Sequence, residues 1–139
     1  MDERQVGSLL FAIDFSQPLY EQILDQMRSS IAKGEIGLGE KVPSVREMAH
    51  ALKINPNTVM HAYQELERDG LTEKRRGQGT FVTTSARKIE NFRERLAFVY
   101  TDDFLQKMQR LGFGWPDISR YLQTLNKERG NMQHGRISD

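Results

Sequence analysis

Apolar residues recur at α-helical spacing along much of the first half of the chain. The segment 16–34 carries them on one face, at Tyr20, Ile23, Leu24, Met27 and Ile31. Gly34 can end this helix. Before it, residues 8–15 form a short apolar run with aromatic side chains, which indicates a strand.

A second helix is predicted from a paired start signal. Ser44 and Glu47 fit the S-x-x-E capping box, in which each side chain accepts a hydrogen bond from the other residue's backbone N–H. One apolar face follows at positions i, i+3, i+4 and i+7, namely Val45, Met48, Ala49 and Leu52.

A third helix is predicted after the short turn 53–55. Asn55 is a good N-cap, and Pro56 suits the first helical position because its missing N–H is not needed there. Gly70 stops the helix. The same apolar spacing recurs at Val59, Ala62, Tyr63 and Leu66. This face leaves four polar residues pointing outward, namely Asn57, Thr58, His61 and Gln64.

Two short β-like runs, 71–75 and 80–84, flank the sequence RGQG and predict a hairpin with a basic, glycine-rich tip. A long helix is then predicted from Ala86, with a break at Gly112 and Gly114, and a further helix over 115–125. The tail 129–139 has little to bury, so we expect it to be disordered.

The order helix, helix, short turn, helix and basic hairpin predicts a mainly α winged helix-turn-helix with a small β-hairpin wing. We expect a DNA-binding domain over 1–84, a two-helix dimerisation appendage over 85–128 and the tail over 129–139. The apolar stripes of the last two helices are too exposed for two helices alone, which favours a homodimer. The predicted dimerisation residues are Phe92, Leu96, Val99, Tyr100, Leu105, Met108, Trp115, Ile118 and Leu122.

The amino-acid composition limits the possible cellular locations of the protein and the kinds of site it can form. The 139 residues include no cysteine, which excludes disulfides and thiolate metal sites, and no apolar run approaches the roughly 18 residues of a membrane span. The N-terminus lacks the pattern of a signal peptide. We therefore expect a cytoplasmic protein that does not associate with a membrane and needs no cofactor.

Charge is distributed unevenly. The net charge is only +1, yet residues 71–88 contain five basic residues against the single acid Glu73. A local basic cluster indicates either an anionic partner or a solvated charged face. Together with the outward polar face of the third helix, it favours duplex DNA: Asn57 and Thr58 can bond base edges, Arg46 can reach a phosphate or guanine, and Arg75 and Arg76 can grip phosphates or a groove.

Three stretches of the sequence resemble the DNA-binding domain of GntR-family bacterial transcription regulators. They are PLYEQI, GLGEKVPSVREMAHALKINPNTVMHAYQELERDGL and RRGQGTFV, within residues 15–84. The resemblance implies a cytoplasmic repressor that binds a two-fold operator as a dimer. It implies DNA contacts at Ser44, Arg46, Asn55, Asn57, Thr58, His61, Arg76, Gly77, Gln78 and Gly79.

The segment after the wing is short for the effector domains of most members and resembles the YtrA-type subfamily, in which a two-helix appendage dimerises the protein. That subfamily is often associated with transporter operons. A small-molecule effector could bind in a groove between the winged domain and the appendage, although no residue pattern defines its chemistry.

Three other interpretations are weaker. A winged-helix protein-interaction module without specific DNA reading is the main alternative, and the basic wing and the outward polar face argue against it. No nucleophile motif, phosphate loop or carboxylate pair indicates an enzyme. His50, His61 and His134 lack tight ligand spacing, which disfavours a metal site.

Overall fold

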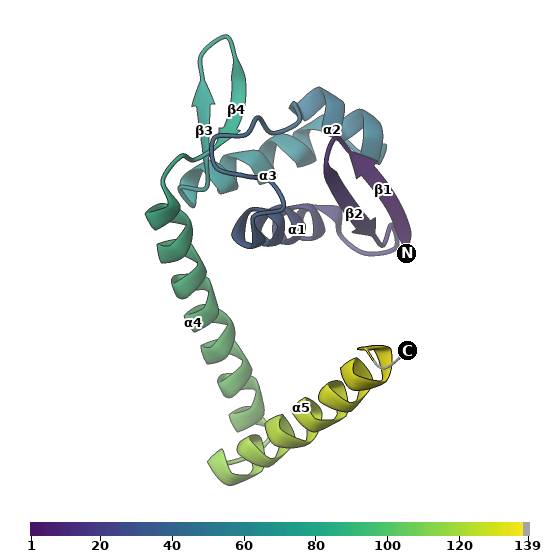
Figure 1. Cartoon of the computed structure of the whole chain (residues 1–139), viewed down its shortest axis with the longest axis vertical. Coiled ribbons are helices and arrows are strands. Elements are labelled where there is room, and N and C mark those ends of the chain that lie inside the picture. Colours follow the sequence, from purple (N-terminus) through teal and green to yellow (C-terminus); the bar gives the residue numbers. More distant parts are fainter. Residues whose placement is uncertain (138–139) are drawn as a thin grey trace. The chain divides into compact units, whose positions relative to one another are not determined.

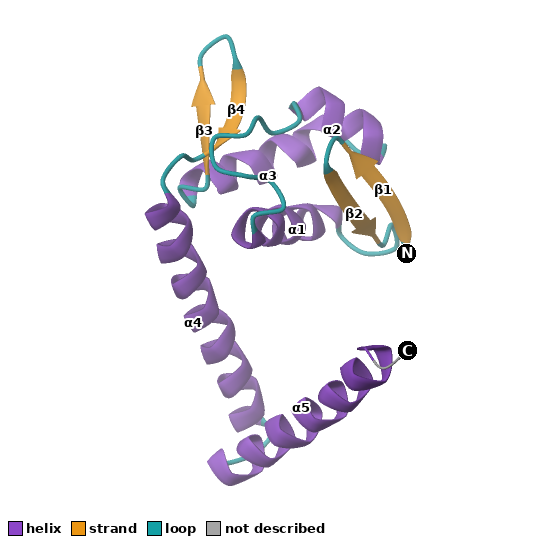
Figure 2. Ribbon diagram, viewed as in Figure 1, coloured by secondary structure: helices purple, strands orange, loops and turns teal. Residues whose placement is uncertain are grey.

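The computed structural model describes the backbone of residues 1–137 and the side chains of residues 1–131. The chain divides into two compact units, Met1–Arg95 and Leu96–Asp139. Figure 1 follows the chain order, and Figure 2 separates helices from strands. The boundary lies inside one continuous helix rather than directly after the wing, and the functional division at residue 84 stays a prediction.

The chain begins with an antiparallel hairpin of β1 (Asp2–Val6) and β2 (Leu9–Ile13). The expected strand over 8–15 is present, but its partner β1 was not predicted. The sequence DERQV has no apolar alternation, and only Val6 is buried. Backbone pairing to β2 therefore forms this strand, and side-chain pattern gives no sign of it.

Helix α1 (Leu19–Lys33) packs next to the hairpin and against α3, and its expected apolar face is buried. Gln26 fastens the hairpin to α1: its Oε1 accepts from the backbone N–H of Ala12 at 2.8 Å, and its Nε2 donates to the Ala12 carbonyl at 2.6 Å. Gly34 ends the helix in the left-handed conformation, with φ of 79°.

Helices α2 (Val45–Leu52) and α3 (Pro56–Arg68) follow, and the wing is the antiparallel pair β3 (Thr72–Arg75) and β4 (Gly79–Val82). The core of this first unit joins the apolar faces of α1, α2 and α3 to β2 and the base of the wing. Its largest fully buried side chains include Phe11, Ile23, Met27, Met48, Leu52, Leu66 and Leu71. The predicted winged helix-turn-helix is therefore confirmed.

Two long helices complete the described chain, α4 (Ala86–Arg110) and α5 (Trp115–Ile137). The turn between them contains Gly112 at φ of 90°. The backbone of α5 continues through residues 129–137, and the disorder expected from the sequence for 129–139 stays a prediction. Residues 138–139 of that prediction lie outside the described part.

Candidate nucleic-acid interface

The starts of α2 and α3 carry the two caps expected from the sequence. Ser44 Oγ accepts from the Glu47 N–H at 3.0 Å, and Glu47 Oε1 accepts from the Ser44 N–H at 3.4 Å. Asn55 Oδ1 accepts from the Asn57 N–H at 2.8 Å. Each cap satisfies N–H groups that the helix leaves unpaired and sets where the helix begins.

Helix α3 has two opposite faces. Val59, Ala62 and Leu66 have no exposed surface, and Tyr63 is 5% exposed. On the other face Asn57, His61 and Gln64 are exposed and Thr58 is half-buried, as expected. Polar groups on a helix with a buried opposite face are held in a fixed pattern, which is what recognition of base edges requires.

A buried hydroxyl fixes α3 to the segment that enters α2. Tyr63 donates from its hydroxyl to the Pro43 carbonyl at 2.6 Å. Burial raises the pKa of Tyr63, with a smaller contribution from the nearby Glu47 carboxylate, so the hydroxyl stays protonated at neutral pH and keeps this donor. This bond therefore ties the middle of α3 to the segment before α2.

Arg46 is exposed on the first turn of α2 and lines a shallow hollow beside the start of α3. Val45, Ala49, Ile54 and Pro56 supply much of its apolar wall. Among the described side chains Arg46 forms no ion pair, so its charge is available to an external anion. Its contact with a phosphate or a guanine stays a prediction.

Arg75 and Arg76, for which the sequence predicts the same role, lie in different environments on the wing. The Arg75 guanidinium lies 4.1 Å from the centroid of the Phe81 ring and is half-buried, whereas Arg76 is exposed at the tip. Gln78 is also exposed, and Gly77 has a φ of 74°, which suits glycine in the tight turn. Arg76 and Gln78 are thus the tip side chains free to enter a groove.

Sequence reasoning missed Lys41, which lies beside the wing. Lys41 forms an antiparallel bridge with Phe81, and its side chain crosses Gly79. Between the first and second helices, the sequence GLGEKVP indicates only a turn. The lysine's place depends on pairing with a strand that comes much later in the chain, so no local signal could have found it.

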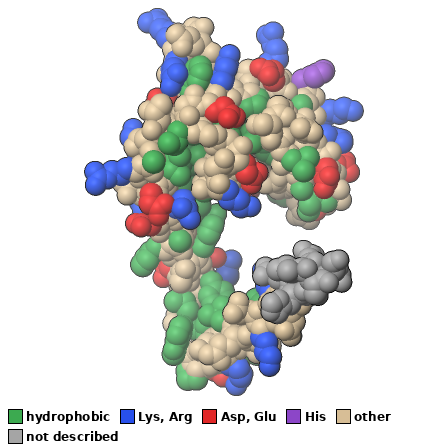
Figure 3. Space-filling view, viewed as in Figure 1, with side chains coloured by type: hydrophobic (Ala, Val, Ile, Leu, Met, Phe, Trp, Pro, Cys, Tyr) green, Lys and Arg blue, Asp and Glu red, His purple; other side chains and the backbone are tan. Residues whose placement is uncertain are grey.

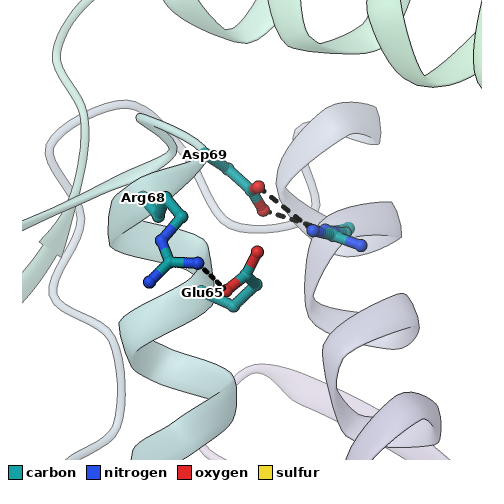
Figure 4. A network of polar contacts seen from close by, with 4 residues as sticks. Glu65, Arg68 and Asp69 are labelled. Carbon is teal, nitrogen blue, oxygen red and sulfur yellow. Dashed lines mark hydrogen bonds and ion pairs between the residues drawn. The ribbon is translucent and has the colours of Figure 1, made fainter.

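A second missed group ties the end of α3 to α1 and α4. The Asp69 carboxylate, labelled in Figure 4, accepts two hydrogen bonds from Arg28, at 2.9 Å from Nε and 3.0 Å from Nη2. The Arg28 guanidinium also lies 5.4 Å from the centroid of the Phe92 ring. Arg28 therefore connects three helices of the first unit.

Two predicted dimerisation residues are buried within the single chain. Phe92 is 5% exposed within the first unit, where it packs near Arg28, and Ile118 is 1% exposed in the second unit. Both are core residues of the single chain, and their role in dimerisation stays a prediction. The apolar spacing that selected them cannot distinguish a face covered by its own chain from one covered by another.

The remaining apolar residues of α4 and α5 are more accessible. Leu96, Leu105 and Met108 are half-buried, whereas a larger group is well exposed. That group comprises Phe98, Val99, Tyr100, Leu111, Trp115, Tyr121, Leu122 and Leu125. Apolar side chains gather along α4 in Figure 3, while Lys and Arg side chains project around the wing. An apolar surface of this extent is typical of a protein interface.

Other kinds of site find little support. No group of three or more His, Cys, Asp or Glu residues in the described part is placed to hold a metal ion, and the side chain of His134 lies outside that part. Of the helices described, none has both the length and the apolar character needed to cross a membrane.

Comparison with known proteins places this geometry in a family. Residues 19–82 match the bacterial regulatory proteins of the gntR family. Over 112 residues the chain is 38% identical to YhcF of Bacillus subtilis (strain 168), an uncharacterised HTH-type transcriptional regulator, and the match covers 81% of this chain and 93% of YhcF. The chain belongs to the GntR family.

The similarity of this GntR-family chain extends to YtrA-type members. It is 50% identical over 72 residues to the HTH-type transcriptional repressor YtrA of Bacillus subtilis (strain 168). The matched region covers 52% of this chain and 55% of YtrA. A GntR-family transcriptional regulator from Listeria monocytogenes has a similar structure, with a TM-score of 0.71, 34% identity and coverage of 81% of this chain and 98% of that one.

A YtrA from Sulfolobus acidocaldarius, a GntR-family transcription factor, matches with a TM-score of 0.53 and 32% identity, over 68% of this chain and 97% of its own. These findings confirm the expected GntR, YtrA-type identity. The chain is accordingly a DNA-binding transcription regulator and not an enzyme.

Proposed function

We propose that this GntR-family chain is a cytoplasmic repressor that binds a two-fold operator as a homodimer. The observation that carries the proposal is the outward polar face at the start of α3, formed by Asn57, Thr58 and His61, in the same unit as a basic wing. Side chains held this way can offer a fixed donor and acceptor pattern to the major groove.

The contacts divide into reading and positioning. Asn57 suits a bidentate bond to adenine, and Thr58 can bond a base edge or touch a thymine methyl. Arg46 and the N–H groups at the start of α3, next to Asn55, suit phosphates, because a helix N-terminus favours anions. Ser44 lies at the corresponding start of α2 and keeps its hydroxyl proton free to donate.

At the wing, Arg76 and Gln78 suit an adjacent groove, and Arg75 suits a phosphate. Gly77 and Gly79 lack side chains, which lets the hairpin backbone approach the duplex closely.

Dimerisation is supported by the exposed apolar surface of α4 and α5. Val99, Tyr100, Trp115 and Leu122 are each more than two-fifths exposed in the single chain. Leu96, Leu105 and Met108 extend this surface as half-buried neighbours. Burial of such side chains against a second copy would remove them from water and is favourable by about 25 cal/mol per Å². Two copies would then present two α3 helices to two half-sites.

Repression is supported by the similarity to the repressor YtrA, which covers about half of each chain. A small-molecule effector stays a prediction from the sequence. Thermal scans of the dimer with pooled metabolites would test it, since a ligand that binds only the folded state raises Tm.

The proposal is tested by selection from random duplexes with the full chain. We expect enrichment of a palindromic sequence whose half-sites are separated by about one helical turn, with an affinity at least ~1,000-fold above that for random DNA. Equal, weak affinity for all duplexes would reject sequence-specific reading. A reporter placed behind the selected operator should lose expression when the protein is present, and a gain would reject repression.

A further inference from the structure

The wing sheet has a third segment that the chain order does not suggest. The Val42 N–H donates to the Thr80 carbonyl at 2.8 Å, and the Val82 N–H donates to the Glu40 carbonyl at 2.9 Å. Lys41 lies between these bonds, in an antiparallel bridge with Phe81. Residues 40–42 thus pair with the edge of β4 that β3 does not use.

The pairing places two cations on one face of this sheet. Directly opposed residues share a face, and so do residues two apart along a strand. Arg75 opposes Gly79, Gly79 and Phe81 are two apart, and Phe81 opposes Lys41. Arg75 and Lys41 therefore flank β4 from its two neighbours, whereas Lys74, opposite Thr80, lies on the other face.

The absence of a side chain at Gly79 leaves room for the Lys41 side chain to cross β4. A β-carbon at Gly79, whose φ is 120°, would lie 2.9 Å from Lys41 Cε and 3.6 Å from Lys41 Nζ. The ammonium group consequently rests above the backbone of β4, close to the tip. Arg75, which opposes Gly79, lies instead over the Phe81 ring at 4.1 Å. The two cations thus converge on the same strand from opposite sides.

Neither charge is neutralised within the described part of the chain. Lys41 and Arg75 form no ion pair there. Glu73 shares their face, but its Oε1 accepts a hydrogen bond from Thr83 Oγ1 at 3.2 Å, at the end of β4 away from Gly79. Two like charges brought over one strand repel each other, and a bound anion would offset that repulsion.

We propose that Lys41 and Arg75 together form a DNA-phosphate site on this face of the wing sheet. This rests on the proposed DNA-binding function and assigns Lys41, from the connection between α1 and α2, to the wing. In this arrangement Lys41 and Arg75 on the sheet face bind a phosphate, and Arg76 and Gln78 at the tip enter the groove.

The test compares Lys41→Met with the unchanged chain in fluorescence titrations of selected and random duplexes at several salt concentrations. Methionine keeps an unbranched chain across Gly79 and removes only the charge. Loss of one phosphate contact should reduce the slope of log K against log salt by about 0.9 and the affinity at 0.15 M salt by about fivefold, on both duplexes. Lys41→Arg should retain the original slope, and Lys41→Met should retain the original Tm.

Two variants control for charge and for place. Lys74→Met removes a charge from the opposite face of the same hairpin, and Lys107→Met removes an exposed charge from α4. Both should leave the slope nearly unchanged. An unchanged slope in Lys41→Met, or an equal fall in Lys74→Met, would overturn the phosphate site.

The same titrations separate this inference from the proposed function. If the unchanged chain binds random DNA with a slope that depends on Lys41 but shows no preferred sequence, operator reading fails and the phosphate site stands. If a preferred sequence is bound and the slope ignores Lys41, the phosphate site fails alone. Absence of binding to any duplex at low salt would reject both.

Discussion

At the scale of single residues, the sequence predicted which side chains of α3 face inward because helical spacing is a local property. Asn57, Thr58 and His61 followed from that prediction. It could not separate Arg75 from Arg76, since adjacent identical residues on a hairpin differ only in the face they occupy. Lys41 escaped for the related reason that its partner Phe81 lies far along the chain.

Thr58→Ala and Arg76→Ala should weaken DNA binding in different ways. Thr58 is proposed to contact a base, so its loss should cost about 1–3 kcal/mol on the selected operator and little on random DNA. Arg76→Ala should weaken binding to both duplexes and flatten the salt slope by about 1. Titrations on both duplexes measure this, and a uniform loss for Thr58→Ala would contradict its reading role.

Lys53 offers a test of backbone strain. It ends α2 in the left-handed conformation, with φ of 57°, a position that glycine tolerates at no steric cost. Lys53→Gly should therefore raise the free energy of unfolding by about 0.5–1 kcal/mol, as measured in urea. Gly34→Ala, at the matching end of α1, should lower it by a similar amount. A lower free energy of unfolding in Lys53→Gly would contradict the expected relief of backbone strain at this position.

At the scale of elements, helices with caps were predicted well, since a capping box and a buried stripe each signal a helix independently. Strand β1 was missed because it depends on its neighbour β2. The anchoring of α4 through Phe92 and Arg28 was missed because it joins residues from three separate helices.

The Arg28–Asp69 pair should stabilise the first unit measurably. The side chains are only 17% and 10% exposed, and Asp69→Asn removes the charge from two short hydrogen bonds. We expect a loss of about 1.5–3 kcal/mol in urea unfolding. Glu65→Gln is the matched control, because its pair with Arg68 at 3.5 Å is more exposed and should contribute under about 1 kcal/mol. Equal losses would show that Arg28 does not organise these helices.

At the scale of the whole molecule, the family and the winged fold were predictable, whereas the burial of individual apolar residues in α4 and α5 was predictable only in part. Helical spacing found the apolar stripe of α4 and α5. It could not tell that Phe92 and Ile118 are covered by their own chain, because that depends on tertiary packing.

The proposed dimer gives a test at this scale. Val99 is 57% exposed, and Val99→Arg would place an unpaired charge in the apolar interface. The dissociation constant of the dimer should rise more than ~10-fold in sedimentation equilibrium, and the dependence of Tm on protein concentration should weaken. Gln109→Arg adds the same charge at an exposed polar position of α4 and should have little effect. A monomeric unchanged chain would reject the dimer.

The two faces of α3 also bear on how this regulator changes over evolutionary time. Folding of the helix rests on Val59, Ala62, Tyr63 and Leu66, while Asn57 and His61 contribute little buried surface. Exchange of those exposed residues should alter the free energy of unfolding by no more than about 0.5 kcal/mol. A duplicated gene could therefore acquire a new operator by a few substitutions without passing through an unfolded intermediate.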